Sequence, residues 1–237
     1  MKNKIYSCFI FFISGFMCFA QMNAEELLLK ALAAHGGDRY KEVKSITYQK
    51  RINHFDASGA VLDTVIENHT IDFLNSTSQF SWRLRGDDFT AIQSKDSVTL
   101  QINGVHTRDT ATIIKMEKSL KAATYVFWQP FKLIDPNAIL ESKGIITLFN
   151  GWQVHVLEVQ YPNSDDRWYF YFDTKTFLLK ATGVFFKKRY SLIVNDLQEK
   201  YTGLNLNAKR TSYFTNSAFV PRRVNTQYQY EIISLSK

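Results

Sequence analysis

The side chains best suited to acid–base or metal chemistry are five histidines. They are His35, His54, His69, His106 and His155. No two of them stand at the short spacings that bring two ligands onto one metal ion, so the sequence predicts no metal site. His54 and Asp56 could meet on one strand face, since alternate residues of a strand project the same way. A lone histidine and aspartate beside a turn are usually solvated, so we expect no catalytic pair there.

Paired carboxylates occur twice, at residues 87–88 and 165–166. Such pairs can act as acid and base in glycoside hydrolysis, but both fall in predicted turns, where aspartate is favoured for local hydrogen bonds. The sequence also lacks the Gly-x-Ser-x-Gly elbow, the Gly-x4-Gly-Lys-Ser/Thr phosphate loop, the Gly-x-Gly-x-x-Gly fingerprint and the His-Glu-x-x-His motif. We therefore predict no catalytic residue, no cofactor and no enzymatic activity.

Aromatic residues, at 15% of the chain, are its most distinctive feature. Residues 152–188 contain three runs rich in aromatic and β-branched residues, separated by turn-forming residues, which predicts an antiparallel meander. A turn at residues 173–176 would pair Phe172 with Phe177, Phe170 with Leu179 and Trp168 with Ala181. The inward face would then carry Trp168, Phe170, Phe172, Phe177 and Leu179, with Leu157, Val159 and Tyr161 beside them.

A second aromatic segment lies in the middle of the chain, just before and after Pro130. With Pro130 and Pro136 in it, this segment cannot be a regular helix throughout. It should either plug the sheet or cover the mouth of a cavity. The predicted lining of an apolar cavity therefore adds Tyr125, Phe127, Trp128 and Phe131 to the inward residues of the meander.

Two helices should position these segments. The first is capped by Asn23 and ends at His35 and the glycine after it; we interpret His35 as a capping residue beside the last carbonyls. The second begins where the β pattern breaks at Asp109, carries apolar residues at helical spacing, and ends before Pro130.

The remaining chain alternates as strands do. Predicted strands cover residues 43–55 and 60–70 around a turn at 56–59, then 71–85, 89–95 and 97–103. After the meander, further strands are predicted at residues 190–201, 206–214 and 224–235. We therefore expect a mainly β protein with a few helices (α+β), in which a strongly curved antiparallel sheet covers an N-terminal and a mid-chain helix.

The N-terminus has the pattern of a secretory signal peptide. Lys2 and Lys4 precede a short apolar run that ends in small residues at Ala20, which predicts cleavage there and one mature domain over residues 21–237. The alternative of an anchoring helix is disfavoured because the run is shorter than a bilayer requires. Lipid attachment at Cys18 is disfavoured because Met17 is bulkier than a lipobox normally allows.

Cleavage would remove both cysteines, Cys8 and Cys18, and leave no thiol or disulfide. It would also remove Lys2 and Lys4, lowering the formal net charge from +7 to +5. That balance is ordinary for a soluble protein, although it could favour weak peripheral contact with anionic headgroups or polysaccharide. We expect a periplasmic or secreted monomer with no nucleic-acid partner.

The order of these parts resembles the LolA/LolB-like periplasmic lipoprotein-carrier fold. The resemblance rests on the Ala-His-Gly-Gly motif at residues 34–37, Val43-Lys-Ser-Ile46, the mid-chain helical insertion before Leu133-Ile-Asp-Pro136, and the hairpin at residues 168–179. The chain is further similar to a secreted family of unknown function within that fold. The resemblance implies a half-barrel closed by helices around a hydrophobic cavity for lipid moieties.

These observations favour a carrier or binding protein for a lipid, an acyl chain or another apolar ligand. Each buried methylene of such a ligand would contribute about 0.8 kcal/mol. Two alternatives stay open: an enzyme that modifies an envelope polymer or lipid in the same cavity, and a structural accessory protein whose aromatic residues only fill the core.

Overall fold

Thirteen strands make up one antiparallel sheet in the computed structural model, which describes residues 22–95, 97–162 and 164–237. The strands of the first half are β1 (Ser45–Phe55), β2 (Val61–Asp72), β3 (Thr77–Leu84), β4 (Asp87–Gln93), β5 (Val98–Ile102) and β6 (Val105–His106). Those of the second half are β7 (Ile139–Thr147), β8 (Gln153–Gln160), β9 (Arg167–Asp173), β10 (Leu179–Phe186), β11 (Arg189–Gln198), β12 (Asn207–Thr215) and β13 (Pro221–Ser236). The expected signal peptide lies outside the described residues.

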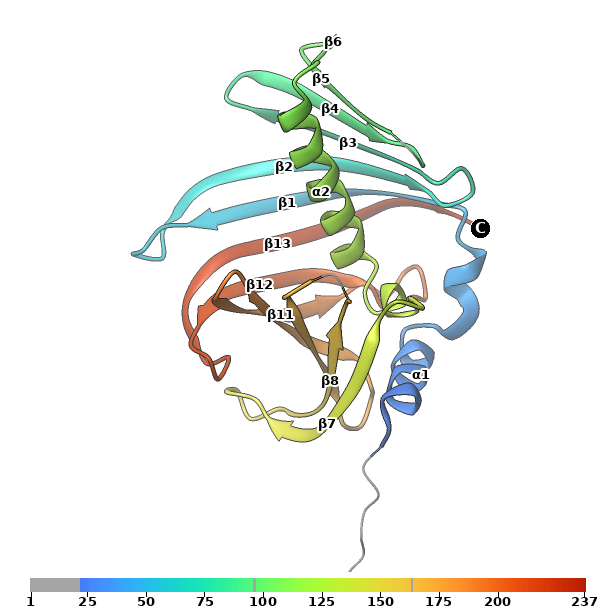
Figure 1. The fold of residues 1–237 in the computed structure, drawn as a ribbon, viewed down its shortest axis with the longest axis vertical. Helices are drawn as coiled ribbons and strands as arrows, with labels where there is room; N and C mark the ends of the chain where they lie inside the picture. The colour runs from blue at the N-terminus through green and yellow to red at the C-terminus, as the bar shows by residue number, and fades with distance from the viewer. Residues whose placement is uncertain (1–21, 96, 163) are drawn as a thin grey trace, which may run out of the picture.

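The spatial order of the strands is β6-β5-β4-β3-β2-β1-β13-β12-β11-β10-β9-β8-β7. The outermost strands β6 and β7 do not pair with each other, so the sheet stays open. Figure 1 shows this sheet curving around the long central helix, which lies on its concave side. The expected curved antiparallel sheet with a few helices is confirmed.

Helix α1 (Ala24–Ala34) begins after the predicted N-cap Asn23, and helix α2 (Thr110–Phe127) begins after Asp109, where the strand pattern was expected to break. The Asn23 side chain accepts a hydrogen bond from the Glu26 amide at 2.8 Å, and Asp109 accepts from the first free amides of α2. The 3-10 helices η1 (Gly37–Glu42) and η2 (Phe131–Leu133) follow α1 and α2 respectively. Helix α1 contacts β7 and β8, while α2 contacts β4 and β5.

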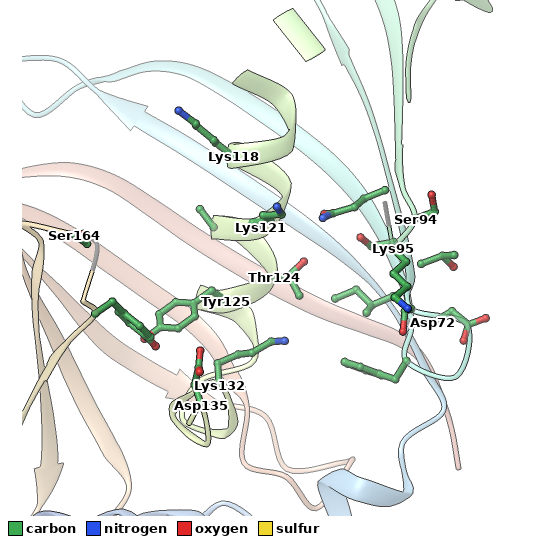
Figure 2. Close-up of a pocket in the computed structure, with 18 of the residues that line it drawn as sticks. Asp72, Ser94, Lys95, Lys118, Lys121, Thr124, Tyr125, Lys132, Asp135 and Ser164 are labelled. Carbon is green, nitrogen blue, oxygen red and sulfur yellow. The ribbon is translucent and has the colours of Figure 1, made fainter. Parts of the chain in front are cut away.

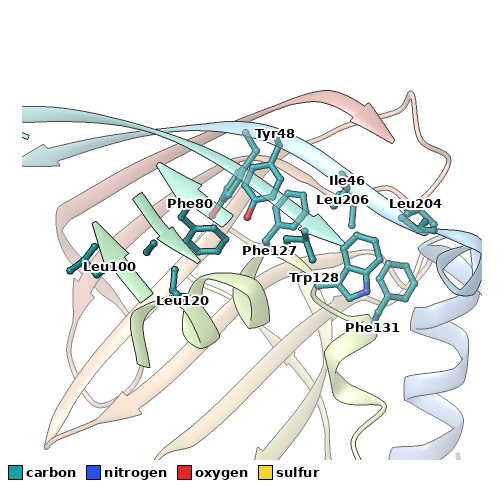
Figure 3. Close-up of a cluster of buried hydrophobic side chains, with 14 residues drawn as sticks. Ile46, Tyr48, Phe80, Leu100, Leu120, Phe127, Trp128, Phe131, Leu204 and Leu206 are labelled. Atoms are coloured by element: carbon teal, nitrogen blue, oxygen red, sulfur yellow. The ribbon is translucent and has the colours of Figure 1, made fainter. Parts of the chain in front are cut away.

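The core consists of three groups of buried side chains. The first joins α2 and η2 to the concave face, where Tyr48, Phe80, Leu120 and Phe127 pack together (Figure 3). The second packs α1 on strands β8 to β10, and the third covers the opposite face of those strands. The segment after α2 is buried at Trp128, Gln129, Pro130, Phe131 and Leu133, so it plugs the sheet, as one of the two sequence interpretations expected.

The inward face of the meander is confirmed, but its predicted register is wrong. Phe172 pairs with Leu179 instead of Phe177, and Trp168 pairs with Val184 instead of Ala181. The turn is two residues longer than expected because the Asp173 carboxylate accepts hydrogen bonds from the backbone amides of residues 175 and 176. Phe177 then takes a left-handed conformation (φ 57°) before β10 begins.

Two further differences concern strand boundaries. Strand β2 continues to Asp72, whose carboxylate accepts from the Asn75 amide at 2.9 Å, so the turn follows residue 72 instead of residue 70. Strand β7 was not predicted. It is an edge strand whose residues are partly or fully exposed, so its sequence shows no buried apolar face, and Gly144 (φ 82°) interrupts it.

Candidate functional site

A groove of about 1070 Å³ runs beside the C-terminal half of α2. It reaches from the β2–β3 turn and the segment after β4 to the loop between β8 and β9. Figure 2 shows Lys118, Lys121, Thr124 and Tyr125 projecting from α2, with Asp72 and Lys95 on the opposite wall. This volume lies at the upper end of the range typical of ligand-binding cavities.

One wall of the groove is aromatic. The Tyr125 ring meets the Trp168 ring edge to face, with 5.4 Å between centroids, and the Tyr161 hydroxyl donates to the Tyr125 hydroxyl at 3.3 Å. Burial raises the pKa of Tyr125 well above its ordinary range, and the hydrogen bond with Tyr161 adds to this shift. Both the hydroxyl and the ring therefore stay uncharged, which suits contact with an apolar ligand.

The rim of the groove is charged. It carries the ammonium groups of Lys95, Lys118, Lys121 and Lys132, together with the carboxylates of Asp72, Asp135 and Asp166. Lys121 pairs with Glu117 at 2.5 Å, one helical turn earlier. Asp135 accepts from the Asn137 amide at 2.9 Å and so closes its own turn. The groove thus combines an apolar wall with a polar, solvated mouth.

The nine residues predicted to line an apolar cavity occupy different places. Tyr125 and Trp168 line the groove, whereas Trp128 and Phe131 border a smaller cavity of about 410 Å³ beside η1. The other five are packed against protein: Phe127, Phe170, Phe172, Phe177 and Leu179. Of these, Phe170, Phe172 and Leu179 have no exposed surface.

Several groove residues were missed by sequence reasoning. Lys118 and Lys121 were not predicted, yet they stand seven and four residues before the predicted Tyr125, so helical periodicity alone puts them on the same side of α2. That spacing was the available signal. The opposite wall, from Ile71 to Ser78 and from Gln93 to Lys95, joins them only through the pairing of β2, β3 and β4.

Arg210 holds the end of α2 in place and was also missed. Its guanidinium donates to Asn195 Oδ1 at 2.7 Å, to the Val126 carbonyl at 3.2 Å and to Gln129 Oε1 at 3.3 Å. The Val126 carbonyl needs this donor because the residue four positions later is Pro130, which has no N–H. Arg210 is 1% exposed, and no ion pair links it to a carboxylate among the described residues. Burial lowers its pKa.

The interpretation of His35 as a capping residue is confirmed. Its Nδ1 donates to the Ala31 carbonyl at 2.8 Å, and its Nε2 accepts from the Leu179 amide at 3.4 Å. Burial lowers the pKa of His35 to about 4, so the ring is neutral at physiological pH. Gly36, with φ of 102°, supplies the left-handed residue expected after the helix.

Asp56 lies at the turn after β1, and Asp165 and Asp166 lie in the loop before β9, as predicted. The turn predicted for Asp87 and Asp88 is wrong, because these residues begin strand β4. Asp56 accepts from the Ser58 amide at 2.8 Å, and His54 instead approaches Asp63 at 4.0 Å. Asp88 pairs with Arg83 at 2.8 Å on the surface.

In the part of the chain that the structure describes, no group of three or more His, Cys, Asp or Glu residues is arranged to hold a metal ion. Within the same residues, no helix combines the length and hydrophobicity needed to cross a membrane.

The fold is an open antiparallel half-barrel that encloses the long helix α2 and the buried segment after it. Solved structures of other proteins share this fold. A LolA superfamily protein from Nitrosomonas europaea aligns with a TM-score of 0.59 and 8% identity, covering 91% of this chain and 93% of its own. A DUF1329 family protein from Desulfovibrio piger gives 0.55 and 11%, with coverage of 88% and 91%.

A third structure, described as an outer membrane lipoprotein-sorting protein domain from Vibrio parahaemolyticus, gives a TM-score of 0.50 and 11% identity, with coverage of 90% and 92%. No family model matches the sequence, and no curated protein matches it. The chain has a LolA/LolB-like fold, as the sequence resemblance implied.

Proposed function

We propose that this protein is a non-enzymatic carrier or binding protein of the cell envelope that holds the acyl chain of a lipid or lipoprotein. The observation that carries the proposal is the groove beside α2, with its aromatic wall of Tyr125, Tyr161 and Trp168 below a charged rim. Acyl chains gain about 0.8 kcal/mol for each methylene removed from water, so even partial burial supports binding.

The envelope location is supported by two further observations. The expected signal peptide would direct the chain out of the cytoplasm as a periplasmic or secreted protein. The fold is shared with a domain described as an outer membrane lipoprotein-sorting protein, which supports a lipid-related role in the envelope for this chain, without any handover partner. Lys95, Lys118, Lys121 and Lys132 at the groove mouth suit weak, peripheral contact of a monomer with anionic headgroups.

The test begins with the purified protein as it comes from its host. Organic extraction and mass spectrometry should release a lipid, and the extracted protein should bind cis-parinaric acid with a saturable rise in fluorescence. Trp168→Ala should weaken that binding about tenfold through the lost ring contact. Trp152→Ala is the matched control, because Trp152 packs on the opposite face of β8 to β10.

Tyr125→Ala, compared with Tyr201→Ala at a side chain that is 99% exposed, repeats the comparison at a second position of the wall. A protein that yields no extractable lipid and shows no saturable binding of the fatty acid would refute the proposal. Equal affinity in the wall and control variants would place the acyl chain elsewhere in the molecule.

A further inference from the structure

A third cavity, of about 320 Å³, lies across α2 from the groove. Strands β1 to β3 form its floor, and Met116, Ser119, Leu120 and Ala123 of α2 form its roof. Its walls are largely apolar, with Phe80 among them. Two charged side chains, Lys50 and Glu67, also face it. Apolar walls with a few convergent polar groups are the usual features of a small-molecule site.

The charged pair belongs to a chain of hydrogen bonds that runs from the partly exposed Glu67 to the buried Tyr48. Lys50 Nζ donates to Glu67 Oε2 at 3.0 Å, and His69 Nε2 donates to the same oxygen at 2.8 Å. His69 Nδ1 in turn accepts from the Tyr48 hydroxyl at 3.1 Å. The side chain of His69 is 0% exposed, whereas those of Lys50 and Glu67 are 12% and 22% exposed, so this chain runs from the protein interior to the cavity.

The charges on this pair are stable. Burial opposes the charge of Glu67, but the hydrogen bond from His69 and the nearby Lys50 ammonium outweigh it and lower the pKa of Glu67 to about 2. Burial acts to lower the pKa of Lys50, but the electrostatic effects of Tyr230 and Glu67 outweigh it. The net result is a raised pKa for Lys50. The pair therefore presents a full ammonium and a full carboxylate with no net charge.

The pair also has unused hydrogen-bonding capacity. Lys50 carries three N–H donors, and one of them is used by Glu67 Oε2. Both bonds to Glu67 fall on Oε2, which leaves Oε1 without a hydrogen-bond donor among the described residues. Both side chains are partly exposed, at 12% for Lys50 and 22% for Glu67, so these free positions are open to a ligand. Beside the cavity, a donor and an acceptor thus stand next to each other.

We propose that this cavity binds an amphiphile whose head is uncharged and both donates and accepts hydrogen bonds, such as a hydroxyl or a primary amide. The head would accept from Lys50 Nζ and donate to Glu67 Oε1, while its tail would lie against Trp82 and Met116. A charged head would gain little, because the pair is already neutral overall. The site goes beyond the proposed carrier function, since α2 separates it from the groove.

Methyl NMR offers a local assay, because the sequence has only four methionines and Met116 lines this cavity. The full chain, labelled with ¹³C-methyl methionine and assigned with Met22→Leu, is titrated with 1-octanol, octanamide, octanoate and heptyl methyl ether. The alcohol and the amide should shift the Met116 signal saturably. The ether lacks a donor and octanoate repels Glu67, so each should bind at least about tenfold more weakly.

The charged pair is tested by Lys50→Met with Glu67→Gln, which removes both charges together and keeps an acceptor for His69. Octanol and octanamide should then bind about tenfold more weakly and no better than the ether. The matched control is Arg83→Met with Asp88→Asn, an exposed ion pair at 2.8 Å that joins β3 and β4, and it should leave all affinities unchanged.

A second variant, Ala123→Leu, narrows the cavity without touching the pair and should weaken all four probes. The proposal is overturned if neither octanol nor octanamide shifts Met116 saturably, or if the charge-free variant keeps the order of affinities. Binding of cis-parinaric acid in the groove is measured on the same proteins. If cis-parinaric acid binds more weakly to Trp168→Ala but not to the variant with Lys50→Met and Glu67→Gln, the groove and the cavity bind ligands independently. The two proposals can then be judged separately.

Discussion

Arg210→Ala should be one of the most damaging single substitutions in the sheet. It leaves the Val126 carbonyl and Asn195 Oδ1 buried without their donor, at about 1 to 3 kcal/mol each. It also removes the largest fully buried side chain, and such truncations cost about 2 to 5 kcal/mol. In the opposite direction, removing the buried cation also removes its desolvation penalty of several kcal/mol, which offsets part of this loss. We therefore expect a net loss of about 3 to 5 kcal/mol in the free energy of unfolding.

Equilibrium unfolding in urea measures this loss directly, provided that the slope with denaturant is unchanged. Arg222→Ala, at an exposed position on the neighbouring strand β13, is the control and should change stability by less than about 0.5 kcal/mol. Arg210→Lys should recover only part of the loss, because one ammonium cannot reach three separated acceptors. A loss below about 1 kcal/mol in Arg210→Ala would refute the assigned anchoring role.

Three further predictions concern other parts of the chain. Phe170→Ala should cost about 3 to 5 kcal/mol of stability in urea unfolding with unchanged fatty-acid affinity, since Phe170 is wholly buried; a loss of affinity with little destabilisation would instead place it in a cavity. His35 has a folded-state pKa of about 4 against 6.5 for the free side chain, so the unfolded state binds the proton first. Unfolding free energy should therefore fall as pH drops from about 6.5 to 4, by about 3 kcal/mol, and His35→Gln should flatten that profile. Asp173→Ala should cost about 1 to 2 kcal/mol in thermal or urea unfolding by removing the acceptor of two turn amides; no change would mean that the turn forms without it.

Local patterns in the sequence were sufficient for the features that depend on neighbouring residues. The cap at Asn23, the start of the second helix near Asp109, the turn at Asp56 and the shared face of Trp168, Phe170 and Phe172 all follow from residue types and spacing within short segments. The resemblance of the order of helices and strands to the LolA/LolB-like fold then predicted the overall fold. The register beyond Asp173 did not follow, because its carboxylate lengthened a turn whose sequence also suits a shorter one.

The sites depended on contacts between distant residues. Lys50 meets Glu67 because the register of β1 and β2 pairs the two residues, and Arg210 meets Val126 because α2 lies inside the curved sheet. None of these residues belongs to a sequence motif, so the sequence around each of them does not distinguish a buried charge from an exposed one. The sequence by itself determined which segments become strands and helices and which faces are apolar. Only the tertiary structure decided that most predicted cavity residues are core, and that open space remains on either side of α2 and beside η1. The physical reason is that packing fills whatever volume complementary side chains can reach.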